Sequence, residues 1–314
     1  MSVAVVVSAL VYRSQRSLPP APLVASARAR PGESLGGAQG ALPGGALPSP
    51  AAIAKTGEGC VVDDHGMGDY VEVPGGGGRL FVRPGAVQES GAYRLLVHFH
   101  AGDAVRRLLA PDAWDFNLLL IDAGNGSAVY RSRVASRAAF DALVAGADRA
   151  ASAHLGREAR ASGVVVTSFS AGYGAVAAIA SARDGSPRIE GIVLLDSLHA
   201  SYAPASRLPD ESSLRPFVDA ARAAQGGGNF FMGFTHTAIV PPDYASTTEC
   251  CAAVASALGL REEAVGWAGE GRLPVRSQLR SGNLVVRGYG GGDQAAHCDQ
   301  LRLLPGLLRE LIAR

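Results

Sequence analysis

The chain has 314 residues, a formal net charge of +1 and 18% charged residues. This length accommodates one α/β domain of ordinary size together with a tail. The balanced charge argues against a nucleic-acid partner and against a strongly acidic, solvating chain.

The first 58 residues are expected to lie outside the folded domain. Residues 3–11 form an apolar run that is too short to span a bilayer as a helix. The run resembles a signal-peptide core with a small-residue cleavage site at 25–27, although basic residues follow it instead of preceding it. Residues 17–56 are rich in Pro, Ala, Gly and Ser, so we expect a disordered linker. Export, periplasmic or secreted, is therefore favoured over a cytoplasmic location, and the mature protein is expected to have no membrane span.

Residues 59–314 are predicted to form the folded domain. It opens with a hairpin, because residues 69–73 and 79–83 alternate polar and apolar side chains around the glycines at 75–78. The acidic group Asp63-Asp64-His65 is more typical of a solvated turn than of a metal site.

Strand-like and helix-like segments alternate from residue 93 onward. This alternation predicts an α/β fold, a mostly parallel, doubly wound sheet with helices on both faces. Residues 200–226 contain one helical piece and are expected to form a small cap. The predicted strands are 93–100, 115–121, 163–169, 189–196, 229–240 and 283–289, and the predicted helices include 104–110, 136–161, 214–224, 247–258 with a threonine cap, and 299–313.

The segment Ser168-Phe169-Ser170-Ala171-Gly172 joins a β-branched strand to an Ala-rich helix. It resembles the nucleophile elbow of the α/β-hydrolase family, with serine in place of the first glycine. The resemblance implies that Ser170 is a nucleophile and that the amide of Ala171 helps to bind an oxyanion. The alternative is an ordinary strand-to-helix turn with a capping serine.

The same resemblance implies a catalytic triad in the chain order Ser, acid, His. His297 lies in a glycine-rich loop after the last predicted strand and is the expected general base. Asp196, which ends the strand after the elbow, is the preferred acid. Asp243 after the next strand is the alternative acid, and Asp293 is a weaker choice.

Further candidates lie at the carboxyl ends of predicted strands, where ligands bind in open α/β sheets. His98-Phe-His-Ala-Gly102 resembles the family's oxyanion loop, which makes the amide of Ala101 or Gly102 a donor and His100 a site residue. Ser127 and Tyr130 are expected to line the cleft. His199 and His236 are expected to face it, either binding substrate or bonding within the loops.

The implied activity is cleavage of a small carboxylic ester through an acyl-enzyme, without a cofactor or a metal. The same triad also serves amidases, peptidases and acyltransferases. A non-catalytic binding protein on the same fold is a further alternative. The sequence does not indicate the substrate or the oligomeric state.

The four cysteines are Cys60, Cys250, Cys251 and Cys298, and none forms a C-x-x-C pair. In an oxidising compartment, one of the two adjacent cysteines can bridge to Cys60 or Cys298. Buried free thiols are the other possibility.

Overall fold

The computed structural model of the protein describes residues 59–181, 188–204, 206–267 and 273–313. The signal-like run and the linker expected in the first 58 residues lie outside these described residues.

Ten strands of the described chain form one sheet in the order β1-β2-β4-β3-β5-β6-β7-β10-β9-β8. The strands are β1 (Val71–Val73), β2 (Arg79–Val82), β3 (Ala92–Phe99), β4 (Phe116–Ile121), β5 (Arg160–Phe169), β6 (Arg188–Leu195), β7 (Phe231–His236), β8 (Glu263–Trp267), β9 (Val275–Ser281) and β10 (Leu284–Tyr289).

The six central strands run parallel, from β4 through β3, β5, β6 and β7 to β10. The predicted hairpin, β1 with β2, adds antiparallel strands at one edge, and β9 with β8 does so at the other. The predicted fold class, a mostly parallel α/β sheet, is confirmed.

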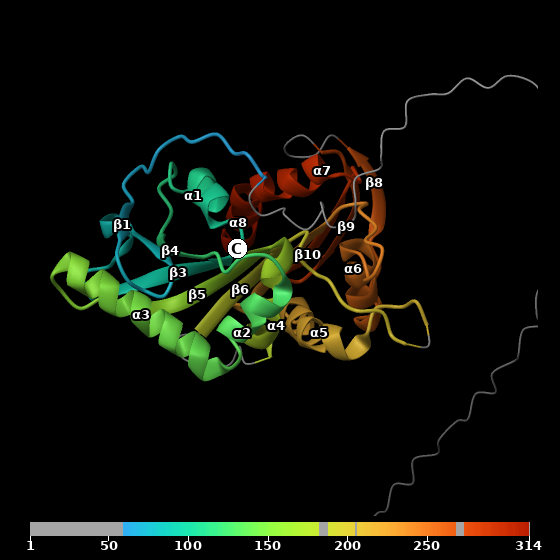
Figure 1. Ribbon diagram of the computed structural model, residues 1–314, viewed down its shortest axis with the longest axis horizontal. Helices are drawn as coiled ribbons and strands as arrows, with labels where there is room; N and C mark the ends of the chain where they lie inside the picture. Colours follow the sequence, from blue (N-terminus) through green and yellow to red (C-terminus); the bar gives the residue numbers. More distant parts are fainter. Residues whose placement is uncertain (1–58, 182–187, 205, 268–272, 314) are drawn as a thin grey trace, which may run out of the picture. The chain divides into compact units, whose positions relative to one another are not determined.

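Helices cover both faces of this sheet (Figure 1). One apolar core receives buried side chains of α2 to α6, and the opposite core receives those of α1 and α8. The helices are α1 (Gly102–Leu109), α2 (Ser127–Arg133), α3 (Arg137–Leu155), α4 (Tyr173–Ala180), α5 (Glu211–Gln225), α6 (Thr247–Ala257), α7 (Gln294–Asp299) and α8 (Leu304–Ile312), with short 3-10 turns η2 (Pro84–Ala86), η3 (Ser170–Gly172) and η4 (Gln300–Leu303).

The central strands have continuous apolar runs because helices pack on both faces of the sheet. Every residue of β4 and of β7 is buried, as a strand packed on both faces requires. None of the helices among the described residues is both long and apolar enough to cross a membrane.

Four local predictions need correction. The strands β8 and β9 were not predicted, because β9 is only partly buried and mixes Arg, Gln and Ser with its apolar residues. The cap of α6 is Ser246, not Thr247, and it forms a capping box with Glu249. The single predicted helix at 299–313 is instead η4 followed by α8, with Pro305 in the first turn of α8. His297, predicted to lie in a loop, lies on the short helix α7 that precedes them.

The stretch expected to form a cap contains α5, whose buried side packs into the core. Leu214 and Phe217 are almost fully buried there, so α5 belongs to the helical layer on the sheet. Within the stretch 200–226, only the described residues before Glu211, where α5 begins, remain predicted to form a cap.

Candidate active site

Four non-glycine residues of the described chain have a positive φ, and all four follow neighbouring strands. His100 and Ala101 follow β3 (φ 75° and 60°), Ser170 follows β5 (47°) and Asp196 follows β6 (43°). The order β3-β5-β6 places these three strand ends side by side. Left-handed backbone is unfavourable for such residues and is typical of functional sites. The strain therefore marks the carboxyl ends of β3, β5 and β6 as the candidate site.

Ser170 is held in a tight turn from β5 through η3 into α4. A Cβ at Gly172 would collide with the backbone carbonyl of Phe99, and one at Gly174 would collide with that of Ser127. Only glycine permits this close approach of the α4 end to its neighbours. The half-buried Ser170 hydroxyl therefore lies at the apex of a turn that small residues make possible.

Ser168, the serine that replaces the first glycine of the motif, supports the backbone of this turn. The Ser197 hydroxyl donates to the carbonyl of Ser170 over 2.8 Å. Its single proton is then used, so the buried hydroxyl of Ser168 donates to Ser197, also over 2.8 Å. This departure from the motif thus holds the Ser170 carbonyl in place.

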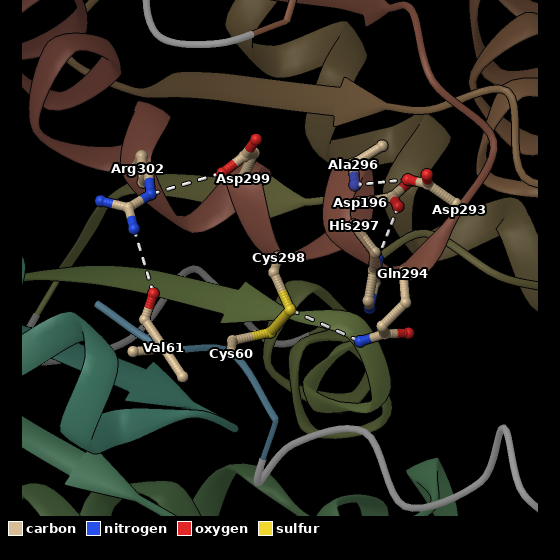
Figure 2. Close-up of a disulfide and its surroundings, with 10 residues drawn as sticks. All are labelled: Cys60, Val61, Asp196, Asp293, Gln294, Ala296, His297, Cys298, Asp299 and Arg302. Atoms are coloured by element: carbon tan, nitrogen blue, oxygen red, sulfur yellow. Dashed lines mark hydrogen bonds and ion pairs between the residues drawn. A yellow bond between two sulfur atoms is a disulfide. The ribbon is translucent and has the colours of Figure 1, made fainter.

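Asp196 and His297 form a buried hydrogen-bonded pair. The Nδ1 of His297 lies 2.7 Å from Oδ2 of Asp196. His297 is 8% exposed and Asp196 is 2% exposed. Figure 2 shows the imidazole on α7 pointing towards this carboxylate. Because a carboxylate only accepts, Nδ1 carries the proton and Nε2 is left with a lone pair.

Three further donors hold the Asp196 carboxylate. They are the amide and the hydroxyl of Thr237, at 3.1 and 2.9 Å, and the hydroxyl of Thr247. Burial alone raises the pKa of Asp196, but the hydrogen bond and the charge of His297, together with the Thr247 hydroxyl, outweigh it and hold that pKa below its usual value. Asp196 is therefore ionised at neutral pH.

The pairing of β5 with β6 places Ser170 beside Asp196. Phe169 pairs with Leu195, so Ser170 and Asp196 are the first residues beyond neighbouring strands. The imidazole of His297 packs on the ring of Phe169, with 4.3 Å between the ring centres. No hydrogen bond joins the Ser170 hydroxyl to the imidazole among the described residues. Ser170 and Asp196 nonetheless lie at neighbouring strand ends, and His297 packs on the residue before Ser170.

The other two candidate acids lie elsewhere. Asp243 is exposed and has no hydrogen bond or ion pair to His297 within the described chain. Asp293 accepts from the amide of Ala296 and caps the N-terminus of α7. Neither supports the imidazole.

The loop after β3 contains two histidines with different surroundings. His98 is fully buried, and its Nε2 donates to the carbonyl of His100 at 2.6 Å while its Nδ1 accepts from Thr167 at 2.7 Å. Burial lowers the pKa of His98 to about 3, so the ring is neutral. His98 therefore anchors the strained backbone at His100.

The His100 ring stands between Tyr130 and Phe169. Its Nδ1 lies 2.8 Å from the Tyr130 hydroxyl, which also accepts from the amide of Ala123. The ring stacks on Phe169, with 6.0 Å between centres. Burial lowers the pKa of His100, so it is a neutral group of the site.

Gly102 is not an available oxyanion donor, which corrects part of the prediction. Its amide donates to the Asp122 carboxylate at 3.0 Å, at the start of α1. No acceptor within the described chain occupies the amides of Ala101 or Ala171. Ala171 follows Ser170 directly in the chain, and Ala101 follows the neighbouring strand β3.

His236 does not face the cleft either. It is buried, and its ring nitrogens contact the Thr248 hydroxyl at 2.8 Å and the Glu262 carboxylate at 2.9 Å. Because Thr248 donates to the carbonyl of Thr237, it must accept from His236. Burial raises the pKa of Glu262, but the hydrogen bond from His236 outweighs this and lowers it. This buried pair joins β7 to the β8–β9 edge of the sheet.

His199 lies near the Asp196–His297 pair. Its ring is half-buried between Tyr173 and Tyr244, with centres 5.5 and 5.2 Å away. Burial lowers the pKa of His199 to about 4, even though the charge of Asp196 acts in the opposite sense. It is a neutral, aromatic-flanked side chain beside the site.

A cavity of about 580 Å³ opens next to the β3 loop. Tyr130 lines it, as predicted for the cleft, whereas Ser127 is half-buried at the start of α2 and is not part of the lining. The lining consists of residues 60–62, His100, Ala101, Asp103, Ala104, Arg107, Asp122, Gly124, Asn125 and Tyr130.

Several residues that support the site were not identified from the sequence. Thr237 and Thr247 hold Asp196, and Ser197 holds the Ser170 turn. Thr237 and Ser197 carry only the signal of a hydroxyl just beyond a strand, and Thr247 that of a hydroxyl at the start of a helix, and many residues share these signals.

A disulfide joins Cys60 to Cys298, the neighbour of His297 on α7 (Figure 2). Of the two alternatives left open for the adjacent cysteines, a bridge and buried free thiols, the second is the one found. Cys250 and Cys251 are buried free thiols of α6, whose pKa values burial raises.

Comparisons with known proteins give little guidance. No protein-family model and no curated protein matches the sequence. Among solved structures, TT1662 from Thermus thermophilus is similar at 14% identity, covering 78% of this chain and 98% of that one, with a TM-score of 0.41. A likeness at that level carries no argument about activity.

Proposed function

We propose that the protein is a serine hydrolase of the α/β-hydrolase type that cleaves a carboxylic ester through an acyl-enzyme. The observation that carries the proposal is the buried Asp196–His297 pair at the end of β6, beside the strained Ser170 at the end of β5. An acid that orients an imidazole next to a serine is the arrangement that activates a hydroxyl as a nucleophile.

In the proposed mechanism, Nε2 of His297 accepts the hydroxyl proton while Oγ of Ser170 attacks the ester carbonyl. Asp196 stabilises the imidazolium that forms. The imidazolium then gives the proton to the departing alcohol, and the acyl group stays on Ser170. Water attacks this acyl-enzyme by the same proton route in reverse, which releases the acid and restores the serine.

The developing negative charge on the carbonyl oxygen needs donors that are fixed before the reaction. The amides of Ala101 and Ala171 suit this role, because no partner occupies them and both residues lie at neighbouring strand ends. Loss of one such donor typically costs about 100- to 1,000-fold in turnover.

Hydrolysis of p-nitrophenyl esters tests the proposal. We expect Ser170→Ala and His297→Ala to lose at least about a thousandfold in kcat. Ser181→Ala is the matched control, because that exposed hydroxyl donates only to a carbonyl within its own helix. Near wild-type turnover in either site variant would overturn the assignment.

A comparison of two Asp→Asn variants tests which aspartate is the acid of the proposed triad. Asp196→Asn is expected to lose about a thousandfold or more, since the amide no longer holds the imidazole in the required tautomer. Asp243→Asn should keep wild-type kcat, because its side chain is exposed. The reverse ranking would move the acid to Asp243.

Two experiments separate the rival functions. A fluorophosphonate probe should label wild-type protein at Ser170, whereas a non-catalytic binding protein would stay unlabelled. Esters, amides and short peptides of matched acyl group, with and without an acceptor alcohol, then distinguish an esterase from an amidase, a peptidase or an acyltransferase.

A further inference from the structure

Residues 59–64, here called the strap, connect two helices of the candidate site. One tie is the Cys60–Cys298 disulfide to α7, and Arg302 just beyond α7 donates to the carbonyl of Val61 at 3.0 Å (Figure 2). The other ties reach α1, where Arg107 donates to the carbonyl of Val62 at 3.1 Å and Arg106 pairs with Asp64 at 2.6 Å. The strap thus bridges the helix that follows Ala101 and the helix that carries His297.

Apart from the disulfide, α7 is held by the Asp293 cap, by the buried Ala296 and by the contacts of His297 itself. It has six residues, fewer than an isolated helix needs for stability. Three glycines, Gly290 to Gly292, connect it to β10, and glycine leaves the backbone its greatest freedom. The backbone bonds of this loop, from Gly290 to Pro274 and from Ala238 to Gly291, end before α7 begins.

After α7 the chain is held by apolar burial. Leu301 and Leu304 are fully buried in the core that contains α1. The segment from Asp293 to Asp299 therefore lies between a flexible loop and a packed core, and the disulfide is the covalent anchor within it.

We propose that the Cys60–Cys298 disulfide is a positioning element of the reaction: it fixes His297 against Asp196 and Ser170 by tying α7 to the strap. The inference rests on the proposed function. Neither cysteine touches the reacting atoms, and the effect passes through the imidazole. A displacement of a catalytic group by about 1 Å can cost about 100-fold in rate.

The strap also forms one wall of the cavity. Cys60, Val61 and Val62 line it together with His100 and Ala101. Opening the disulfide is therefore expected to loosen this wall of the cavity, in addition to lowering kcat for all esters.

The test compares Cys60→Ser with wild type, because Cys60 is distant in sequence from the base. The first readout is the rate at which a fluorophosphonate labels Ser170, which we expect to fall about 10- to 100-fold. The second is the downfield NMR proton of the His297 Nδ1–H···Asp196 bond, assigned by its loss in His297→Ala. That signal should broaden or disappear in Cys60→Ser at a temperature where near-UV circular dichroism shows a folded protein.

Cys250→Ala is the matched control, because it removes a buried thiol of α6 that takes no part in the bridge. It should label at the wild-type rate and keep the downfield proton. If Cys60→Ser does not fold, mild reduction of the folded wild-type protein opens the same bridge; labelling is then expected to slow about 10- to 100-fold.

The outcomes are distinguishable. A folded Cys60→Ser that labels at the wild-type rate and keeps the downfield proton overturns the positioning role. Where Cys60→Ser is unfolded, an unchanged labelling rate of the folded wild-type protein after reduction of the disulfide overturns it. Wild-type protein that does not label overturns the proposed hydrolase, while the NMR comparison still decides whether the disulfide positions His297.

Discussion

At the scale of single residues, the site consists of strained positions that specific hydrogen bonds maintain. Each left-handed non-glycine residue costs about 1–3 kcal/mol, so its surroundings must impose it. At Asp196 the hydroxyls of Thr237 and Thr247 supply these bonds, and at His100 the ring of His98 does so. These supporting residues are therefore as sensitive to substitution as the groups they hold.

Two substitutions at His98 distinguish its hydrogen bond to the carbonyl of His100 from its hydrogen bond to Thr167. His98→Gln keeps a donor near the position of Nε2 and is expected to retain ester turnover within about tenfold. His98→Asn places its amide nearer to Nδ1 and leaves the carbonyl of His100 without its donor, so a loss of about 100-fold in kcat is expected. Equal activity in the two variants would show that His98 does not hold the loop.

His98 also makes stability depend on pH. Its folded pKa is about 3, below the ordinary value near 6.5 of the unfolded chain. Between these values the unfolded chain binds a proton that the folded chain does not, so stability falls as pH drops below about 6.5. We expect a loss of about 2 kcal/mol between pH 7 and pH 5, measured by urea unfolding. His98→Gln should lack this part of the slope.

At the scale of elements, the elbow depends on close backbone contact. Gly172→Ala and Gly174→Ala would each drive a Cβ into a backbone carbonyl. A loss of about 1–3 kcal/mol or more in the free energy of unfolding is expected from such overpacking. Gly266→Ala is the control, since no atom lies within 4 Å of a Cβ there, and its change should stay within about 0.5 kcal/mol. Urea unfolding of the three variants makes the comparison.

The unpredicted β8–β9 edge is fastened by a buried pair, Glu262 with His236. Glu262→Ala leaves a buried ring nitrogen of His236 without its acceptor, and a loss of about 1–3 kcal/mol in the free energy of unfolding is expected. Glu263→Ala removes an exposed carboxylate of β8 and should be neutral. A thermal-unfolding series on both variants tests this, and equal stabilities would show that the pair does not fasten the edge.

The central strands could be predicted from the sequence because burial on both faces leaves a continuous apolar run, as in β4 and β5. β9 could not, because its solvent side breaks that pattern. The adjacency of His236 to a strand end was visible, yet the sequence does not tell whether ring nitrogens are free or occupied. In the same way, nothing local to Gly102 reveals that Asp122 takes its amide.

At the scale of the whole molecule, the disulfide closes a very long segment of chain. Cys60 and Cys298 are 238 residues apart, and such a pairing depends on the folded sheet and not on local sequence. Bridges over long loops stabilise mainly by restricting the unfolded chain, by about 2–5 kcal/mol. Urea midpoints with and without reductant should differ accordingly, and equal midpoints would mean that the bridge contributes no stability.

The position of the bridge has a consequence for biogenesis. Cys298 follows every strand of the sheet in the chain. During translation, Cys60 therefore cannot form its native disulfide until the last strand has been synthesised. Two competing sulfurs, Cys250 and Cys251, are synthesised before the correct partner, and burial in α6 withdraws them from oxidation. The Cys60–Cys298 disulfide therefore forms late, only after the chain around His297 has been synthesised.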